Sequence, residues 1–487
     1  MALDLKHLSP PQIATSWSYV LVLGGIFLLL RSFYRLFFHP LSHIPGPRLA
    51  AVTHAVEFYH DVIEKMHEKY GPVVRINPRE VHIKDPHFYD EVYAPASGKR
   101  EKDSHFIGVF GSPTSMIATI SHELHRVRRG MLNNFFSKKS VLALSPIIHE
   151  KEAKLMKRLE TSYYDDAVLR LDDAYSALTA DIIMQYSWGV SSGFLDDDNF
   201  KNDVREALNE LTAFVHINRC FPILSTIMRA LPCWVLRRIR PGATALLDMQ
   251  DIVTRSSARK PEKGMQKTIF DALTDANEGL IVVIAGTETM ARALMVASYY
   301  IFRDRQLLLK LRNEIRTVMP TPTTKTSWSE LEQLPILNSV VNETLRVSHG
   351  PIFRSARVAP TESLTYKNIV IPPKTPVSMC SYFVHMDPHI FPQPESFKPE
   401  HWIEAADKGQ HLNKFIVSFS RGSRNCLGLN LASAELYMTL ALIIRRFDIE
   451  LYESGPNSFR IDREMGLGFP KQGDFSLRAK ITKIITE

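Results

Sequence analysis

The sequence FSRGSRNCLG, from Phe419 to Gly428, lies directly before a long apolar segment that ends near Phe447. It matches the pattern FxxGxRxCxG at all five fixed positions. Glycine and serine in its first half favour a turn, and the apolar residues that follow recur at helical spacing. The stretch therefore predicts that Cys426 is presented from a turn just before a helix that begins near Leu427.

Each fixed residue of this stretch has a physical role at a haem iron. Backbone N–H groups and the helix dipole favour the thiolate of Cys426, and a thiolate is a strong donor to haem iron. Gly422 permits a turn with positive φ beneath a flat macrocycle, and Gly428 lets the helix backbone approach closely. Arg424 can donate to a haem propionate, and Phe419 can shield the sulfur from water. We therefore predict that Cys426 is the axial ligand of a haem iron.

The composition excludes several other classes of protein. Of 487 residues, 45% are hydrophobic and 23% are charged, which is typical of a globular chain and not of a disordered, collagen-like or many-span membrane protein. Four cysteines are too few for a disulfide framework. The net charge of +7 is not gathered in a basic tail, so a nucleic-acid partner is not expected.

The N-terminal region contains a segment that is long and apolar enough to span a membrane. No residue from Ile13 to Leu30 is charged, and a helix of this length just crosses a hydrocarbon core. Bulky residues rather than a small-residue cleavage site follow Leu30, which favours a retained anchor over a secretory signal peptide. Basic residues are more frequent after the segment than before it, so the rest of the chain is expected on the cytoplasmic side. Lys6 precedes the segment, and Arg31, Arg35 and Arg48 follow it.

These features divide the chain into four expected parts. Residues 1–12 form a lumenal tail and residues 13–30 a single transmembrane anchor. Residues 31–50 form a basic, proline-rich linker, because prolines interrupt helices and restrict the backbone. Residues 51–487 form one domain.

The remainder of the chain reads as mainly helical with small β-sheets. Apolar residues at three- and four-residue spacing predict helices, at Val56–Tyr70, Ser121–Phe136, Ser145–Tyr163, Asp173–Trp188 and Asn202–His216. Short β-branched runs separated by turn residues predict two pairs of strands, Val73–Ile76 with Val81–Ile83 and Ser363–Tyr366 with Ile369–Ile371.

Two further motifs show that the sequence resembles the cytochrome P450 family along nearly its whole length. Glu343 and Arg346 supply ExxR, which in the family is a buried structural pair. His401 stands where the family usually has an arginine that completes this triad, so the resemblance implies a weaker triad here. The fold implied is that of a cytochrome P450 with an N-terminal transmembrane helix.

The second motif, AGTET at residues 285–289, resembles the oxygen-activating segment of the family. The resemblance implies that Thr289 hydrogen-bonds dioxygen during its activation and that Glu288 relays protons toward it. Gly286, which has no side chain, would leave room for dioxygen above the iron.

The resemblance also implies which residues hold the haem propionates. His125 and Arg129 lie at i and i+4 on one predicted helix and resemble the WxxxR of the family, with histidine in place of tryptophan. Arg354 resembles the arginine that enters from a short strand after ExxR. Together with Arg424, these residues would surround the two carboxylates of haem b, iron protoporphyrin IX.

The function implied is that of a haem-thiolate monooxygenase, which inserts one atom of dioxygen into a hydrophobic small molecule. No flavin or iron–sulfur segment is present in the sequence, so electrons would come from NADPH through NADPH–cytochrome P450 reductase. That partner would dock on a basic face near Arg126, Arg128, Lys138 and Lys139. The anchor would place the protein in membrane lipid as a single-pass protein of the endoplasmic reticulum, with its catalytic domain cytoplasmic.

The phrases HPLSHIPGPRLA, from His39, and RRGMLNNFFSKKSV, from Arg128, resemble membrane-bound fungal secondary-metabolism P450s of the trichodiene oxygenase type. This resemblance implies a terpenoid or polyketide-like substrate. Two alternatives stay open: a P450-fold isomerase or dehydratase that does not use dioxygen, and an inactive haem-binding homologue. The latter is suggested because the segment before Gly279 is shorter than is usual in the family.

Overall fold

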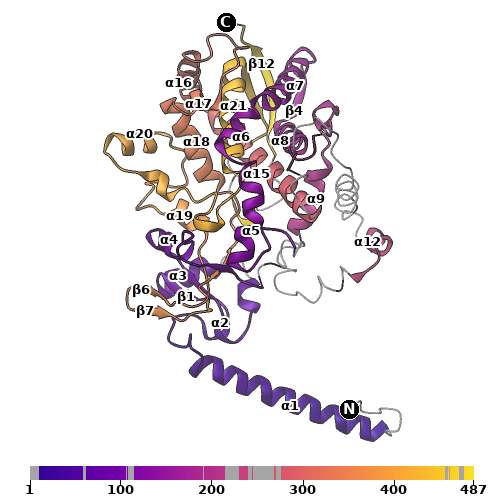
Figure 1. The fold of residues 1–487 in the computed structure, drawn as a ribbon, viewed down its shortest axis with the longest axis vertical. Coiled ribbons are helices and arrows are strands. Elements are labelled where there is room, and N and C mark those ends of the chain that lie inside the picture. The colour runs from indigo at the N-terminus through magenta and orange to yellow at the C-terminus, as the bar shows by residue number, and fades with distance from the viewer. Residues whose placement is uncertain are drawn as a thin grey trace. The chain divides into compact units, whose positions relative to one another are not determined.

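The computed structural model of the 487-residue chain forms two compact units, Met1–Lys84 with Val358–Ser378 and Asp85–Arg357 with Met379–Glu487 (Figure 1). The described residues are 10–58, 62–105, 107, 114–189, 191–213, 227, 230–239, 244, 268–269, 276–455, 459, 461–470 and 476–486.

The first unit consists of a long N-terminal helix, three short helices and short strands. Apolar residues of its helices and first strand form a small core, which contains Ala50, Met66, Val74 and Ile76. The elements are α1 (Pro10–Phe37), α2 (Arg48–Val52), η2 (Ala55–Phe58), α3 (Val62–Tyr70), β1 (Val73–Arg75), β2 (Val81–Ile83), β6 (Leu364–Tyr366), β7 (Ile369–Ile371) and β8 (Pro376–Ser378). Both predicted strand pairs are present as antiparallel pairs, β1 with β2 and β6 with β7.

The apolar N-terminal helix extends beyond the segment expected to cross a membrane. Its apolar stretch, Tyr19–Phe37, is long enough to span a bilayer, and none of it is buried within the chain. The predicted linker at residues 31–50 is therefore helical as far as Phe37. Two hydrogen bonds of Arg35 stabilise this end of the helix. Its Nη1 donates to Val52 O at 2.6 Å, and its carbonyl oxygen accepts from Arg75 Nη1 at 2.9 Å.

These two hydrogen bonds predict that the point of truncation matters for stability. A protein that begins at Arg31 keeps both bonds, whereas one that begins at Pro40 loses both. Because Arg75 is almost wholly buried, the lost acceptor should cost about 2 kcal/mol. Urea unfolding should therefore show the shorter protein to be less stable. Arg35→Ala in the longer protein should give an intermediate loss, and equal stability of all three would show that the helix end contributes nothing.

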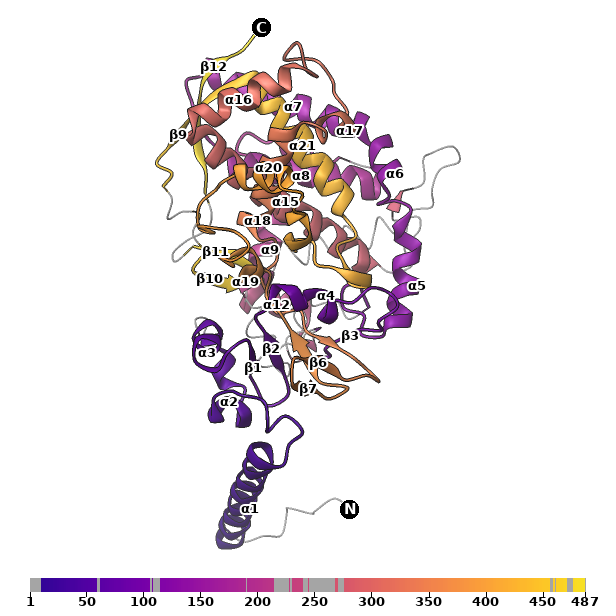
Figure 2. The ribbon, with the colours of Figure 1, turned by 90° about the vertical axis from the view of Figure 1, so that its left-hand side faces the viewer.

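The second unit contains most of the helices (Figure 2). The helices up to the central one are α4 (Tyr89–Val92), α5 (His122–Asn133), α6 (Lys138–Ala143), α7 (Ser145–Tyr164), α8 (Leu171–Trp188), α9 (Asp203–Ala213), α12 (Cys233–Ile239) and α15 (Ala276–Arg303). Those after it are α16 (Arg305–Arg316), α17 (Trp328–Leu331), α18 (Pro335–Ser348), α19 (Ser381–His385), α20 (Glu400–Asp407) and α21 (Leu429–Arg446).

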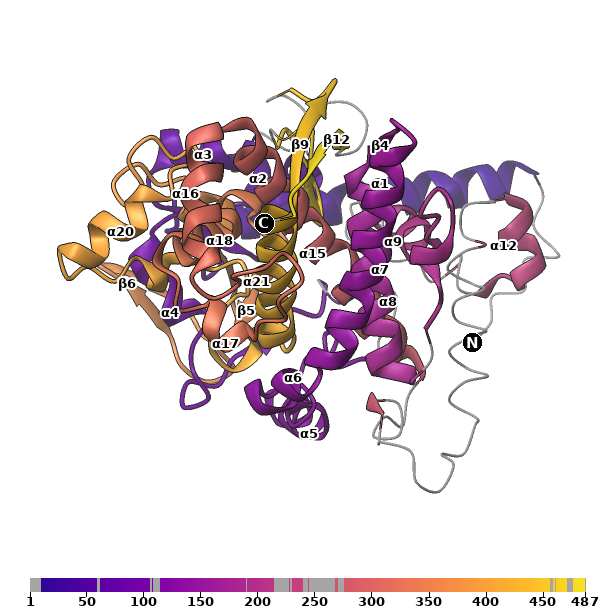
Figure 3. The same ribbon diagram turned by 90° about the horizontal axis from the view of Figure 1, so that it is seen from above.

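The strands of this unit are short. A three-stranded antiparallel sheet joins β4 (Val168–Arg170), β12 (Arg478–Ile484) and β9 (Phe447–Tyr452), and Figure 3 shows β9 beside β12. A second antiparallel pair consists of β10 (Arg463–Met465) and β11 (Leu467–Phe469).

Helix α15 passes through the centre of this unit and organises its core. It is long and apolar enough to span a membrane, but 72% of its apolar window is buried, as expected for a core helix that is apolar on all sides. It packs most extensively on α8 and also contacts α9, α18 and α21. At Gly286 a β-carbon would lie 2.9 Å from Ile183 Cγ1 of α8. The glycine therefore permits close packing of two helices, which corrects the expectation that it leaves room for dioxygen.

The predicted elements agree with the structure in type and differ mainly at their ends. The helices expected at Ser145–Tyr163 and Asp173–Trp188 are α7 and α8. Of the helix expected at Val56–Tyr70, the part from Val62 onward is α3 and residues 56–58 belong to η2, whereas residues 59–61 lie outside the described residues. Residues 1–9 of the expected tail and most of the shortened segment before Gly279 lie outside the described residues.

Candidate functional site

The cysteine stretch forms a closed loop at the N-terminus of α21. The Cys426 N–H donates to Phe419 O at 2.8 Å, and the Asn425 N–H donates to Gly422 O at 3.2 Å. The helix begins at Leu429, with Gly428 as its N-cap, two residues later than predicted. The Cys426 side chain remains accessible at this loop, although protein surrounds it.

Gly422 is required by the shape of this loop. Its φ is +69°, in the left-handed region, and a β-carbon there would collide with the carbonyl oxygens of Tyr93 and Ala94. The next residue, Ser423, donates its N–H to Ala94 O at 3.2 Å. The positive φ at Gly422 agrees with the predicted turn, and the close approach holds the loop against the backbone that follows α4.

The thiol of Cys426 experiences opposing electrostatic effects. Desolvation by the surrounding protein raises its pKa. The Gly428 N–H and the Arg129 guanidinium act in the opposite direction and favour the thiolate. A bound metal ion would remove the thiol proton outright, because a coordinating thiol is deprotonated.

Several buried cations converge beside the loop. Arg424 donates from Nη1 to Thr119 O at 2.7 Å and from Nη2 to Ile120 O at 2.8 Å. Its Nε is buried and has no hydrogen-bond partner among the described residues. Desolvation, together with repulsion mainly from Arg357, lowers the pKa of Arg424 to about 10. Lys102 is affected in the same way, and its pKa lies well below the usual range because of burial and then Arg357 and Arg424.

This cluster of like charges fits an anionic group. The cluster contains four cations, Lys102, Arg129, Arg357 and Arg424. Glu101 and Glu278 are the carboxylates that interact electrostatically with its members. Burying charges of one sign is unfavourable unless an opposite charge compensates them. The unpaired Nε of Arg424 adds a donor without an acceptor. The residues present therefore fit the two propionates of a haem.

The two residues proposed on α5 contribute in different ways. Arg129 donates from Nη1 to Asn425 O at 2.6 Å and from Nη2 to Asn425 Oδ1 at 2.7 Å, so it braces the cysteine loop. His125 is buried, and desolvation followed by repulsion from Arg424 and Lys102 lowers its pKa to about 2. This shift favours the neutral imidazole, so His125 adds no positive charge to the cluster.

The arginine expected after ExxR is displaced by three residues. Arg357, at the start of β5 (Arg357–Val358), is the residue that interacts electrostatically with Arg424 and Lys102. It also lies over the Tyr93 ring, 4.9 Å from its centroid. Arg354 lies instead near the Cys380 thiol. Arg357 therefore replaces Arg354 in the proposed propionate set, because the short strand after ExxR begins at Arg357 rather than at Arg354.

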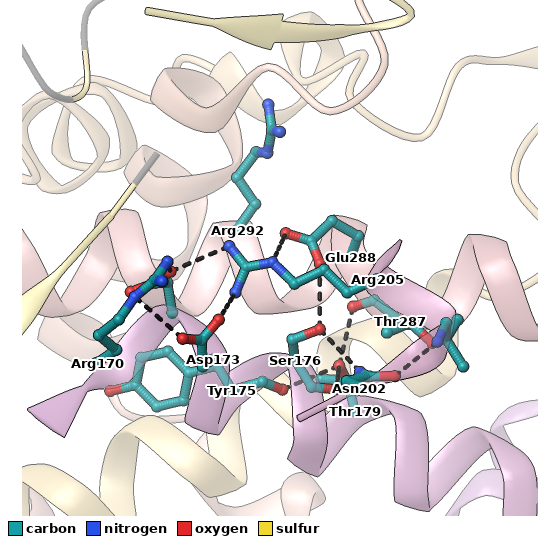
Figure 4. A network of polar contacts seen from close by, with 12 residues as sticks. Arg170, Asp173, Tyr175, Ser176, Thr179, Asn202, Arg205, Thr287, Glu288 and Arg292 are labelled. Atoms are coloured by element: carbon teal, nitrogen blue, oxygen red, sulfur yellow. Dashed lines mark hydrogen bonds and ion pairs between the residues drawn. The ribbon is translucent and has the colours of Figure 1, made fainter. Parts of the chain in front are cut away.

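On α15, Thr289 and Glu288 face in different directions. Thr289 Oγ1 donates to Ala285 O at 2.8 Å, and Ala285 is exposed. Glu288 is buried and points toward α8 and α9, where Ser176 Oγ donates to its Oε2 at 3.1 Å (Figure 4). The structure therefore does not bring the Glu288 carboxyl to the open face that carries Thr289.

Glu288 belongs to a polar network that joins three helices. Figure 4 shows Arg205 of α9 between Glu288 and the acids at the start of α8. Its Nε lies 3.7 Å from Glu288 Oε1 and its Nη2 lies 3.0 Å from Asp172 Oδ2, and it also pairs with Asp173. Arg170, at the exposed end of the network, pairs with Asp172 at 2.6 Å. Burial raises the pKa of Glu288, while Arg205 opposes that shift.

The ExxR pair is fully buried, as the family resemblance implied, and its contact is bidentate. Arg346 Nε lies 2.8 Å from Glu343 Oε2, and Nη2 lies 2.7 Å from Oε1. Arg346 also donates to the carbonyl oxygens of three residues, His385, Pro394 and Ser396.

The third partner of this pair differs from the expectation. Trp402 Nε1 donates to Glu343 Oε2 at 3.0 Å, and the Lys398 N–H donates to Oε1 at 2.6 Å. His401 Nδ1 is buried without a hydrogen-bond partner among the described residues. His401 therefore does not substitute for the expected arginine, because the indole of the next residue supplies the donor.

Two of the four basic residues expected on a docking face are engaged within the chain. Arg128 Nη1 donates to Thr119 Oγ1 at 2.6 Å and to Ser115 O at 3.3 Å. Lys138 pairs with Glu332 and lies over the Trp328 ring, 4.8 Å from its centroid. Arg126 and Lys139 are exposed and remain in the proposed face.

Comparisons with known proteins show what this chain is similar to. A protein-family model described as "Cytochrome P450" matches residues 44–475. Cytochrome P450 monooxygenase aflU of Aspergillus parasiticus is 40% identical, over 96% of this chain and 99% of that protein. Cytochrome P450 monooxygenase TRI4 of Trichoderma arundinaceum is 40% identical over 96% of each chain. Conidiogenone synthase PchP450 of Penicillium rubens is 42% identical, over 93% of this chain and 96% of that protein.

Proposed function

This chain belongs to the cytochrome P450 family and is a P450 monooxygenase, and from that premise we propose that it oxidises an apolar terpenoid or polyketide-like intermediate. Haem b, held by Cys426, supplies the redox chemistry that activates dioxygen and attacks a C–H bond. The observation that carries the proposal is the exposed Cys426 thiol beside a buried cluster of cations.

The proposed roles of the chain's own residues follow from their positions. Arg424 and Arg357, with Lys102, hold the haem propionates, and Arg129 braces the cysteine loop through Asn425. Phe419, Gly422 and Gly428 shape that loop. The ExxR pair supports the fold and takes no part in the chemistry.

Proton delivery is proposed to involve two groups of different kinds. Thr289 faces the open side of α15 and holds a hydroxyl there. Glu288 holds a proton readily because burial raises its pKa, and Arg205 and Asp172 connect it to the exposed Arg170.

The substrate class is proposed from the relatives. TRI4 and conidiogenone synthase are fungal proteins whose sequences are similar to this chain over nearly their whole length. An apolar substrate also agrees with the exposed apolar helix, because a membrane would concentrate such a molecule near the enzyme.

The proposed electron donor is NADPH–cytochrome P450 reductase, and the proposed location is the endoplasmic reticulum. The family requires a redox partner, and Arg126 and Lys139 supply exposed positive charge for an acidic one. The apolar part of α1 would anchor the chain in lipid, with Arg31 and Arg35 on the cytoplasmic side.

Expression together with a reductase, followed by comparison of metabolites with those of a host lacking the gene, tests the oxidation directly. We expect a product that contains one or more oxygen atoms derived from ¹⁸O₂. A product with no label, formed without NADPH, would favour the isomerase or dehydratase instead. Haem uptake with no product at all would favour the inactive homologue.

Thr289 provides a sharper test once that substrate is known. Removal of its hydroxyl in Thr289→Ala should leave haem binding intact but lower the product formed per NADPH by about 10²-fold. The electrons should appear as hydrogen peroxide, because proton delivery is no longer directed.

Thr289→Ser restores the hydroxyl and should recover most of the coupling. The proposed role of Thr289 is contradicted if Thr289→Ala forms as much product per NADPH as the wild-type protein. The ratio of product to NADPH, rather than the rate alone, separates this role from a loss of folded enzyme.

A further inference from the structure

Residues 114–120 form a loop, here called the clamp loop, that is fastened by side chains from four different parts of the chain. It lies immediately before α5, which carries His125 and Arg129. Arg128 donates to Ser115 O and to Thr119 Oγ1, and Lys102 donates through Nζ to Ile117 O. Each of these side chains is a donor that uses an oxygen atom of the loop.

Glu278 differs from the other fastening groups because it is an acceptor. It lies in the first turn of α15 and is buried, and its Oε2 accepts the Met116 N–H. Its charge also favours the ammonium form of Lys102, which binds the next carbonyl of the clamp loop. A buried carboxylate that accepts a backbone N–H makes a strong, directed bond.

The clamp loop is also what orients Arg424. Both Nη atoms of Arg424 are occupied by the carbonyl oxygens of Thr119 and Ile120. The buried Nε is left over for an acidic ligand. The direction in which this guanidinium donates therefore depends on where the clamp loop lies.

We propose that Glu278 is a positioning residue that fixes the clamp loop between α15 and Arg424, and that it thereby sets the shape of the reaction space beside Thr289. Glu278 and Thr289 belong to one rigid helix and are separated by about 16 Å along its axis. A continuous set of contacts thus runs from α15 through the clamp loop to Arg424, a proposed propionate ligand. This inference rests on the proposed haem site.

Amide hydrogen exchange of the full-length protein measures how firmly the clamp loop is held, and it does not depend on activity. In Glu278→Ala, amides of the clamp loop, Met116 above all, should exchange at least about tenfold faster. Glu278→Gln retains an acceptor oxygen and should stay within about threefold of the wild-type protein. Glu123→Ala is the matched control, since that exposed carboxylate near the same loop pairs with Lys99 on the surface.

The affinities of two azoles for the haem-loaded protein then measure access to the iron and the shape of the space around it. Imidazole is small and tests access to the iron, whereas 4-phenylimidazole also tests the shape of the space around it. In Glu278→Ala, binding of 4-phenylimidazole should weaken about tenfold, with imidazole unchanged within about twofold. Glu278→Gln and Glu123→Ala should bind both azoles as the wild-type protein does.

Unchanged exchange at Met116 in Glu278→Ala would overturn the proposal, and so would equal weakening of both azoles. If that variant does not fold, Glu278→Asp withdraws the acceptor by one methylene and supports the same comparison. Failure of the proposed function would look different. The wild-type protein would then show no thiolate-haem spectrum, while the exchange measurement would still decide whether Glu278 fastens the clamp loop.

Discussion

Cys426→Ala is expected to abolish the red-shifted absorption band that a thiolate-ligated haem gives when reduced and bound to carbon monoxide. The Cys426 side chain is exposed. The hydrogen bonds that close its loop join backbone atoms and do not involve the sulfur. Its removal therefore takes away the proposed ligand while leaving the Phe419 and Gly422 hydrogen bonds intact. Absorption spectra of the reduced protein with and without carbon monoxide provide the measurement.

Cys233→Ala is the matched control for this substitution. Cys233 is likewise exposed, in the short helix α12, and its loss should leave the band unchanged. The partly buried Cys380 donates to Ile352 O at 3.1 Å, and desolvation raises its pKa to about 12, so it is unreactive. Cys220 lies outside the described residues. A normal band in Cys426→Ala would remove the central assumption of the proposed function.

Arg346→Met is expected to prevent accumulation of folded protein. The substitution leaves the fully buried Glu343 carboxylate without its bidentate partner and three backbone carbonyls without their donor. Breaking a buried pair in this way typically costs about 3–5 kcal/mol, which is a large part of the stability of most proteins. Haem content and urea unfolding of detergent-solubilised protein measure the loss.

Arg346→Lys tests whether charge alone suffices. A lysine cannot reproduce the five-donor geometry that reaches Glu343 and the carbonyls of His385, Pro394 and Ser396, so it should fail almost as completely. Arg478→Met is the control, because its ion pair with Glu453 is solvent-exposed and worth at most about 1 kcal/mol. Stable, haem-loaded Arg346→Met protein would show that the pair is not structural.

The parts of the site that the sequence predicted are those encoded by short-range spacing. The turn at Gly422, the cysteine before a helix, and the Glu343–Arg346 pair each depend on residues only a few positions apart. The strand pairs and the long helices were also predictable, because their apolar periodicity and turn residues are local.

The parts that could not be predicted depend on which distant residues meet. Arg129 reaches Asn425 across 296 positions of sequence, and Arg424 reaches Thr119 across 305. Trp402 rather than His401 meets Glu343 because a difference of one residue on α20 changes the direction of the side chain. The orientation of Glu288 away from Thr289 follows from 100° per residue on α15 and from the presence of Arg205 on a separate helix.

The local closure of the cysteine loop has a consequence for the affinity of the protein for its cofactor. The Cys426 N–H meets Phe419 O, the Asn425 N–H meets Gly422 O, and the Ser420 N–H meets Val417 O, so each bond joins residues at most seven positions apart. Ordering a residue costs about 1–2 kcal/mol of conformational entropy, and here that cost is met when the chain folds rather than when haem arrives. Binding to a preorganised loop retains more of its free energy. Backbone hydrogen bonds within the cysteine loop would thus contribute to how tightly haem is bound.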